Sequence, residues 1–170
     1  IPIYLREQDL DVISKTNYYL VDQSQVSSGG TVAQLQFKAI DEKPFEVEGL
    51  TLTPLPVWHG RPFTCFGFRF GDVCYISDVS EIPGETARLV EGCGLLILDA
   101  LRPESTHGSH FTIEQAIEHV RLLRPKRTLF TDMAHDIDHE PVDQWLHGLK
   151  KSDGLDIRLA YDGLRVPVDL

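Results

Sequence analysis

Metal-competent side chains follow several strand-like stretches of this sequence. His59 follows the stretch of residues 50–58, Asp78 follows residues 73–77, and His135 comes shortly after residues 127–131. In layered α/β folds the carboxyl ends of strands form the rim where ligands bind. These three side chains can therefore converge although they are far apart in sequence. Imidazole and carboxylate together suit zinc, iron or manganese, and a carboxylate can bridge two ions.

Each of these residues also has an ordinary structural explanation. An Asp after a strand is commonly a turn or helix-cap residue, which is the alternative for Asp78. A single His at a strand end is commonly exposed or hydrogen-bonded, and this alternative applies to His59 and His135. The spacing of the residues leaves both interpretations open.

Two further histidines, His107 and His110, precede an expected helix N-terminus. A helix N-terminus favours anions, so a histidine there can bind a phosphate or act as a general acid. The alternative is that Ser109 or Thr112 caps the helix and both histidines are simply exposed. A serine hydrolase is disfavoured because no G-x-S-x-G surrounds a serine, and the sequence has no G-x-G-x-x-G for a dinucleotide.

The helix that must position these histidines covers residues 113–123. Thr112 and Gln115 form a T-x-x-Q capping box in front of it. Apolar residues then follow at the i, i+3, i+4, i+7 positions of a core-facing helix, and Pro125 ends it. We expect two further helices, over residues 81–91 and 141–150.

Strands are expected between and before these helices. They cover residues 35–40, 45–48, 50–57, 63–70, 73–76, 95–98, 127–130 and 157–161. Gly71 and Asp72 predict a hairpin, and Pro54 and Pro56 predict an edge position or a strand end. The Ser and Gly residues of 23–31 predict a loop. Interleaved strands and helices with an antiparallel-looking first half predict an α/β or α+β sandwich.

Length and composition predict a single domain over residues 1–170. The chain is 42% hydrophobic and 25% charged, which is ordinary for a globular domain. Its net charge of −10 repels phosphate backbones, so we expect neither long nucleic acid nor an anionic membrane as a partner. No apolar run approaches the roughly 20 residues of a membrane span. Three cysteines without a CxxC spacing predict no disulfide framework, and we expect a cytoplasmic location.

Three ordered motifs resemble the later metal-binding motifs of the metallo-β-lactamase superfamily. They are residues 56–60 (PVWHG), 75–78 (YISD) and 132–136 (DMAHD). Further stretches are similar to the phosphodiesterase branch of that superfamily, namely residues 1–5, 9–13, 96–100, 107–112 and 160–164. The resemblance covers essentially the whole chain and implies an αββα sandwich of the metallo-β-lactamase type.

The resemblance also implies roles for individual residues. His59 and His135 are expected as terminal ligands of two metal ions, Zn²⁺ or Mn²⁺, and Asp78 as the carboxylate that bridges the ions. His110 is expected as the general acid or transition-state stabiliser. Three carboxylates are expected to orient ligand histidines by accepting a ring N–H, namely Asp99, Asp132 and Asp136. The implied reaction is hydrolysis of a small cyclic or nucleotide-like phosphodiester by a metal-activated hydroxide.

The sequence departs from the family at one point, because it contains no HxHxDH motif. In relatives this motif supplies two ligands to each metal and precedes the segment that matches residues 1–5. We therefore expect residues 1–170 to be the larger, C-terminal part of a domain truncated at its N-terminus, inactive alone and holding one ion or none. The alternatives are a non-catalytic scaffold and a thioester or lactone hydrolase of the same superfamily. A missing opening segment would expose a sheet edge, which favours a homodimer.

Overall fold

The computed structural model describes residues 1–22, 24, 29, 31–105 and 107–168. The loop predicted over residues 23–31 therefore lies mostly outside the described residues. Contacts within the chain divide it into two compact units, Ile1–Phe45 and Glu46–Leu170. The single domain over residues 1–170 stays a prediction. Among the described helices, none is long and apolar enough to cross a membrane.

The first unit consists of two parallel strands and two helices. β1 (Pro2–Leu5) pairs in parallel with β2 (Gln36–Ala39), and α1 (Glu7–Thr16) and α2 (Tyr18–Val21) come between them in the chain. Parallel strands need such a crossover. The sequence analysis predicted β2 but neither helix. α1 has only three apolar residues among 10, and α2 is only 4 residues long, so neither offers the extended apolar periodicity that identifies a helix.

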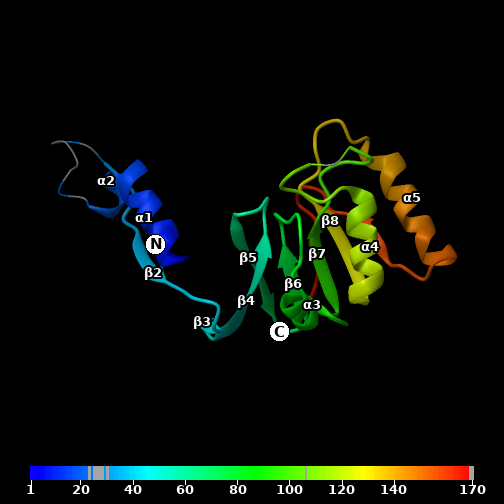
Figure 1. Ribbon diagram of the computed structural model, residues 1–170, viewed down its shortest axis with the longest axis horizontal. Coiled ribbons are helices and arrows are strands. Elements are labelled where there is room, and N and C mark those ends of the chain that lie inside the picture. The colour runs from blue at the N-terminus through cyan, green and yellow to red at the C-terminus, as the bar shows by residue number, and fades with distance from the viewer. Residues whose placement is uncertain (23, 25–28, 30, 106, 169–170) are drawn as a thin grey trace. The chain divides into compact units, whose positions relative to one another are not determined.

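The second unit is built on one seven-stranded sheet with the strand order β3-β4-β5-β6-β7-β8-β9 (Figure 1). The strands are β3 (Phe45–Val47), β4 (Leu50–Trp58), β5 (Thr64–Phe70), β6 (Val73–Ile76), β7 (Leu95–Asp99), β8 (Arg127–Thr131) and β9 (Ile157–Leu159). Pairing is antiparallel from β4 to β6 and parallel from β6 to β9. The predicted strands are all present, and the predicted hairpin joins β5 to β6.

Of the two alternatives predicted at the prolines of β4, an edge position or a strand end, the strand end is wrong. The strand continues to Trp58 and lies between β3 and β5, with Pro54 opposite Phe68 and Pro56 opposite Phe66. A proline removes a ladder donor, which matters only where a partner strand faces its nitrogen. Because β3 is only 3 residues long, its pairing with β4 reaches only the first part of that strand.

Three helices pack against one face of this sheet, α3 (Gly84–Val90), α4 (Ile113–Leu123) and α5 (His139–Ser152). The capping box at α4 is confirmed, since Gln115 N donates to Thr112 Oγ1 and Thr112 N donates to Gln115 Oε1. Leu96 and Leu98 of β7 face these helices in the main core. The α/β class predicted from the sequence is therefore confirmed.

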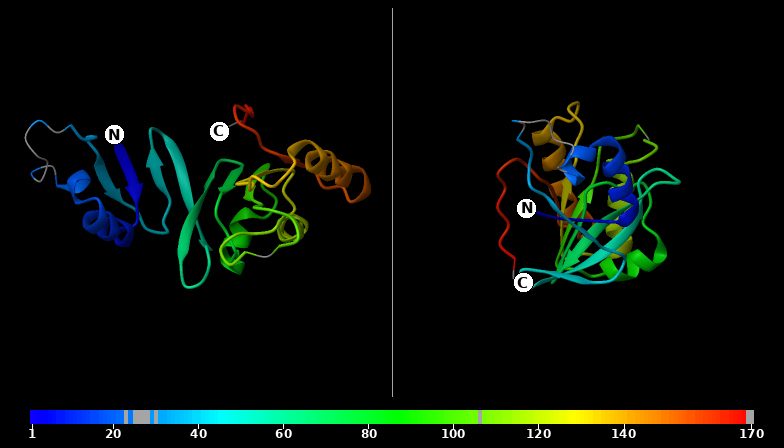
Figure 2. Two further views of the ribbon diagram at one scale, coloured as in Figure 1. Left: turned by 90° about the horizontal axis from the view of Figure 1, so that it is seen from above. Right: turned by 90° about the vertical axis from the view of Figure 1, so that its left-hand side faces the viewer.

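The opposite face of the sheet carries a smaller apolar cluster. Its buried members are Val73, Leu95 and Leu129, and Leu164 and Val166 of the C-terminal segment pack against them. Figure 2 shows this segment, in red, on the side of the sheet away from α3 and α4. The alternation of Leu95 and Leu96 between the two clusters shows that both faces of β7 are buried, as its continuous apolar run predicts.

The direction of the strands places four carboxyl ends at one edge of the sheet. β6, β7 and β8 are parallel, and β4 runs in the same direction because two antiparallel pairings separate it from β6. The segments that follow these four strands therefore start at the same edge. These segments carry the residues that the sequence analysis selected.

Candidate metal centre

His59 lies in a tight turn directly after β4. Its backbone N–H donates to the carbonyl of Phe63 at 2.9 Å, and Phe63 N–H donates to the carbonyl of Gly60 at 2.9 Å. The ring atom Nδ1 of His59 is buried and has no hydrogen-bond partner among the described residues. A buried nitrogen without a partner destabilises the folded state unless a ligand binds it. The turn therefore presents Nδ1 of His59 as a donor atom for a bound ligand.

Asp78 follows β6 and is held by its neighbours. The hydroxyl of Ser77 donates to Asp78 Oδ2 at 2.5 Å, and Cys65 Sγ donates to the backbone carbonyl of Asp78 at 3.1 Å. The side chain of Asp78 is half-buried. One carboxylate oxygen is thus oriented from within the chain, which leaves the other free to face the site.

His110 lies on the segment between β7 and the start of α4. This segment folds back on itself, because Leu101 N–H donates to the carbonyl of Phe111 at 2.9 Å. Phe111 directly follows His110, and its side chain is buried in the core, which fixes the backbone at this point. The capping box then starts at Thr112, so the position of His110 is set from both sides.

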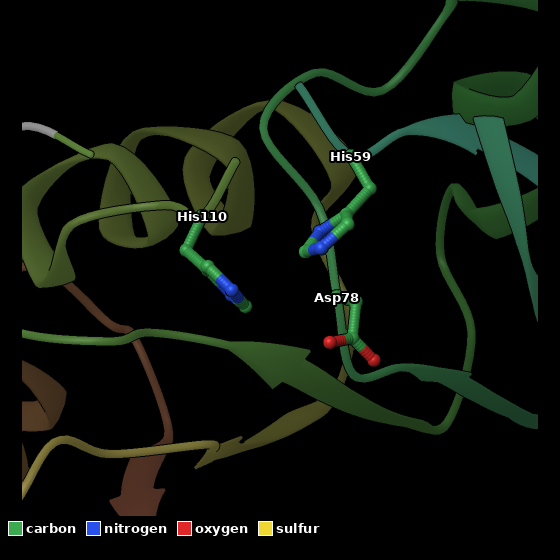
Figure 3. A group of neighbouring side chains, drawn as sticks. All are labelled: His59, Asp78 and His110. Atoms are coloured by element: carbon green, nitrogen blue, oxygen red, sulfur yellow. The ribbon is translucent and has the colours of Figure 1, made fainter. Parts of the chain in front are cut away.

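The structure brings His59, Asp78 and His110 together (Figure 3). One ligand atom from each of the three side chains lies within 4.8 Å of the others. The rings of His59 and His110 lie edge to face with their centroids 4.7 Å apart. Two imidazoles and one carboxylate are a donor set that suits a divalent transition metal ion. The unpaired Nδ1 of His59 supports the same conclusion, so these residues fit a metal ion.

A second group of metal-competent side chains shares His110 with the first. Asp99 Oδ2 lies 2.9 Å and Asp132 Oδ2 lies 3.2 Å from Nδ1 of His110. Asp99 is fully buried at the end of β7, and its Oδ2 also accepts the backbone N–H of Val79 at 2.9 Å. A carboxylate that accepts a ring N–H in this way fixes the orientation of the imidazole.

Burial changes the protonation of both carboxylates. It raises the pKa of Asp99 to about 7, although the Val79 N–H and His110 oppose the shift. Burial also raises the pKa of Asp132, and the charge of His110 again opposes the shift. Near neutral pH the Asp99 carboxyl is therefore protonated more readily than an ordinary aspartate.

Not every predicted site residue joins these groups. His135 and Asp136 lie exposed in the turn after β8, and neither belongs to the two groups found among the described residues. His107 is exposed, with its ring 5.2 Å from that of His110. The roles predicted for His135 and Asp136 stay predictions.

Ser80 is a site residue whose role the sequence analysis did not find. Its hydroxyl accepts the N–H of Gly60 at 2.9 Å and donates to the carbonyl of Trp58 at 3.1 Å. It thus ties the turn after β4 to the segment after β6. A serine two positions after Asp78 forms no sequence pattern that predicts its hydrogen bond with Gly60, because that hydrogen bond depends on the order of the strands in the sheet.

The family model described as a beta-lactamase superfamily domain matches residues 1–133. This is more than half of the chain, so the chain belongs to that family. The resemblance to the metallo-β-lactamase superfamily is therefore confirmed. The matched residues include His59, Asp78 and His110.

The chain is similar to one curated protein and to several solved structures. It is 27% identical to an octanoyltransferase of Porphyromonas gingivalis over 98% of this chain and 32% of that protein. A diphosphatase from the PhnP family is 28% identical, with a TM-score of 0.82 over 99% of this chain and 59% of that one. The metallo-β-lactamase fold protein YhfI of Bacillus subtilis is 20% identical, with a TM-score of 0.71 over 96% of this chain and 63% of that one. The chain thus spans about a third of the octanoyltransferase and less than two thirds of both structures.

Proposed function

We propose that this chain carries part of the active site of a metal-dependent hydrolase that cleaves a small phosphodiester. The observation that carries the proposal is the convergence of His59, Asp78 and His110 from three separate segments onto one rim of the sheet. The similarity to the diphosphatase, which extends over 99% of this chain, supports a phosphorus–oxygen bond as the target.

His59 and Asp78 would hold the cation in this proposal, which we expect to be Zn²⁺ or Mn²⁺. A divalent ion in such a site lowers the pKa of a bound water and polarises a phosphoryl oxygen. Ser77 orients the Asp78 carboxylate, and the turn that ends at Phe63 holds His59. These contacts fix the two donors before an ion arrives, which reduces the cost of ordering them.

His110 is the residue proposed to hand a proton to the leaving oxygen. When Asp99 is ionised, it accepts the N–H at Nδ1 of His110, and Nε2 is then the atom that holds or gives the proton. The backbone N–H of Val79 keeps the Asp99 carboxylate in place. The His110 side chain is only 15% exposed, so the surrounding protein limits competing exchange with water.

A small substrate is favoured over a long nucleic acid. The net charge of −10 repels a phosphate backbone at long range, and this repulsion grows with the number of phosphates. A cyclic or nucleotide-like phosphodiester carries few charges and needs only the local cation.

An acyl compound is the second candidate substrate, because the chain is also similar to an octanoyltransferase. Hydrolysis of a thioester or a lactone would need the same activated water and the same donor to the leaving group. The similarity covers only 32% of that protein, so the acyl transfer named for it has its support mainly outside the region matched here.

The test uses the full-length protein that contains residues 1–170, loaded with Zn²⁺ or Mn²⁺. We expect hydrolysis of bis-p-nitrophenyl phosphate and of at least one cyclic phosphate, and loss of both activities on treatment with a chelator. Turnover of an octanoyl thioester without any phosphodiester turnover would replace the first candidate by the second. Inactivity of the metal-loaded protein towards all of these substrates would overturn both.

A further inference from the structure

Gly60 contacts the segments that carry the other two residues of the metal centre. It directly follows His59, and its N–H donates to the hydroxyl of Ser80 at 2.9 Å. Ser80 lies two positions after Asp78, so this hydrogen bond joins the turn after β4 to the segment after β6. The Ser80 backbone N–H strengthens the junction by donating to the carbonyl of Trp58 at 2.7 Å.

The other side of Gly60 lies against the segment that carries His110. A Cβ atom at this position would lie 2.8 Å from Ser109 Oγ and 3.1 Å from the carbonyl oxygen of Gly108. The Cα of Ser109 would be 3.5 Å away. The Ser109 hydroxyl would have to rotate away, and the backbone oxygen of Gly108 would have to move by a few tenths of an ångström to accept a side chain at position 60. Gly60 also has φ +75°, in the left-handed region that favours glycine.

We propose that Gly60 is a positioning residue that sets the separation between His110 and the pair His59 and Asp78. A methyl group at position 60 would shift residues 108–109 outward by a few tenths of an ångström, and His110 would move with them because it is the next residue. The 4.7 Å separation between the ring centroids of His59 and His110 would increase. The inference rests on the proposed metal centre for its effect on activity, whereas the effect on ring geometry is independent of it.

The test compares Gly60→Ala with Gly49→Ala. Gly49 has φ +85°, and a Cβ there would meet nothing within 4 Å. Both variants therefore carry a left-handed alanine, but only Gly60→Ala creates the contact with residues 108–109. Circular dichroism and thermal unfolding establish that each variant folds.

The first readout is the nuclear Overhauser effect between the ring protons of His59 and His110 in the metal-free protein. We expect equal intensity in the wild type and in Gly49→Ala, and a weaker signal in Gly60→Ala. The second readout is kcat of the zinc-loaded full-length protein with bis-p-nitrophenyl phosphate, which should fall about 10-fold or more in Gly60→Ala, because the proposed proton donor His110 is misplaced.

The double variant Gly60→Ala with Ser109→Gly separates positioning from general damage. It removes the hydroxyl that the new methyl group would meet first, so we expect it to regain part of the ring contact and part of kcat. An unchanged ring contact in a folded Gly60→Ala would overturn the proposal. So would equal losses in Gly49→Ala. If the wild type binds no zinc, the proposed function fails, and the ring contact still decides the role of Gly60.

Discussion

Oδ2 of Asp99 lies 2.9 Å from Nδ1 of His110, and this contact links the buried end of β7 to the rim of the sheet. The same oxygen accepts the N–H of Val79, in the segment that follows β6. The other oxygen, Oδ1, is buried without a hydrogen-bond partner among the described residues. A buried carboxylate with an unpaired oxygen is costly, so the orientation of His110 is obtained at the expense of stability.

Replacing Asp99 by Asn tests this orienting contact. The amide keeps the size of the side chain but removes the charge that favours the N–H of His110 at Nδ1. We expect hydrolysis of the phosphodiester to fall about 10–100-fold, as for the loss of other such partners. The measurement is kcat/KM with bis-p-nitrophenyl phosphate. Asp11→Asn is the matched control, since Asp11 is exposed in α1, and equal losses in both variants would contradict the prediction.

Replacing the histidines one at a time separates metal binding from proton transfer. We expect His59→Ala to weaken zinc binding, because it removes a donor atom. His110→Ala should instead lower kcat about 10²–10⁴-fold, the usual effect of losing a general acid, with a smaller change in zinc affinity. Calorimetry and steady-state kinetics measure the two effects. Equal loss of zinc in both variants would make His110 a metal ligand rather than the acid.

His135 provides an independent check on the same site. It is exposed and lies outside both groups of metal-competent side chains among the described residues. We expect His135→Ala to leave the zinc affinity of residues 1–170 unchanged. A loss as large as that of His59→Ala would show that the turn after β8 rearranges to supply a ligand.

Asp143 and Arg158 predict a pH dependence of stability remote from the metal centre. Asp143 in α5 accepts hydrogen bonds from the guanidinium of Arg158 and from the N–H of Leu159. Arg158 holds the pKa of the Asp143 carboxyl below its usual value. A lowered pKa means that the folded state binds this proton less readily, so the stabilisation is present above about pH 4 and is lost as the pH falls through the folded pKa.

Urea unfolding at several pH values tests this prediction with Asp143→Asn. The free energy of unfolding of the variant should be about 1–3 kcal/mol lower near pH 7, because the hydrogen bonds between the charged Asp143 and Arg158 side chains are weakened. The difference from the wild type should shrink as the pH falls below about 4. Asp153→Asn, at an exposed position after α5, is the control. A difference that stays constant down to low pH would refute the assignment.

The capping box at α4 predicts a stability effect close to the site. Thr112→Ala removes the hydroxyl that accepts the Gln115 N–H, and we expect a loss of about 1 kcal/mol in the free energy of unfolding. Thr112→Ser keeps the hydroxyl and should retain most of that stability. Urea unfolding at pH 7 measures both variants, and an equal loss in the two would assign the effect to the missing methyl group instead.

Local patterns were sufficient to predict the strands of the second unit and helix α4. Residues 95–98 form a continuous apolar run, and the periodic apolar residues after Thr112 have a cap in front of them. α1 has only three apolar residues, Leu10, Val12 and Ile13, so its apolar stripe is much shorter than that of α4. The prolines of β4 do not end the strand, because an edge is enough to accommodate them and the reach of β3 along β4 depends on tertiary structure.

The candidate site could be predicted in part for a similar reason. The rule that ligands lie at the carboxyl ends of strands selected His59 and Asp78, and the structure brings them together. It also selected His135, which lies in an exposed turn. His110 joins the group because the segment before α4 folds back on itself. The hydrogen bond that closes this segment connects Leu101 and Phe111, which are ten positions apart, so a local sequence pattern does not predict it.

The antiparallel hairpins between β4 and β6 have a topological consequence for the site. The chain reverses direction twice between Trp58 and Val73, and an even number of reversals returns β6 to the direction of β4. Insertions in the loop between β5 and β6 preserve this parity and leave His59 at the rim. Removal of a single reversal would send one of the two residues to the far edge, about 13 Å away along a four-residue strand. Length changes in the loop between β5 and β6 should therefore be tolerated, whereas loss of one strand should separate His59 from Asp78.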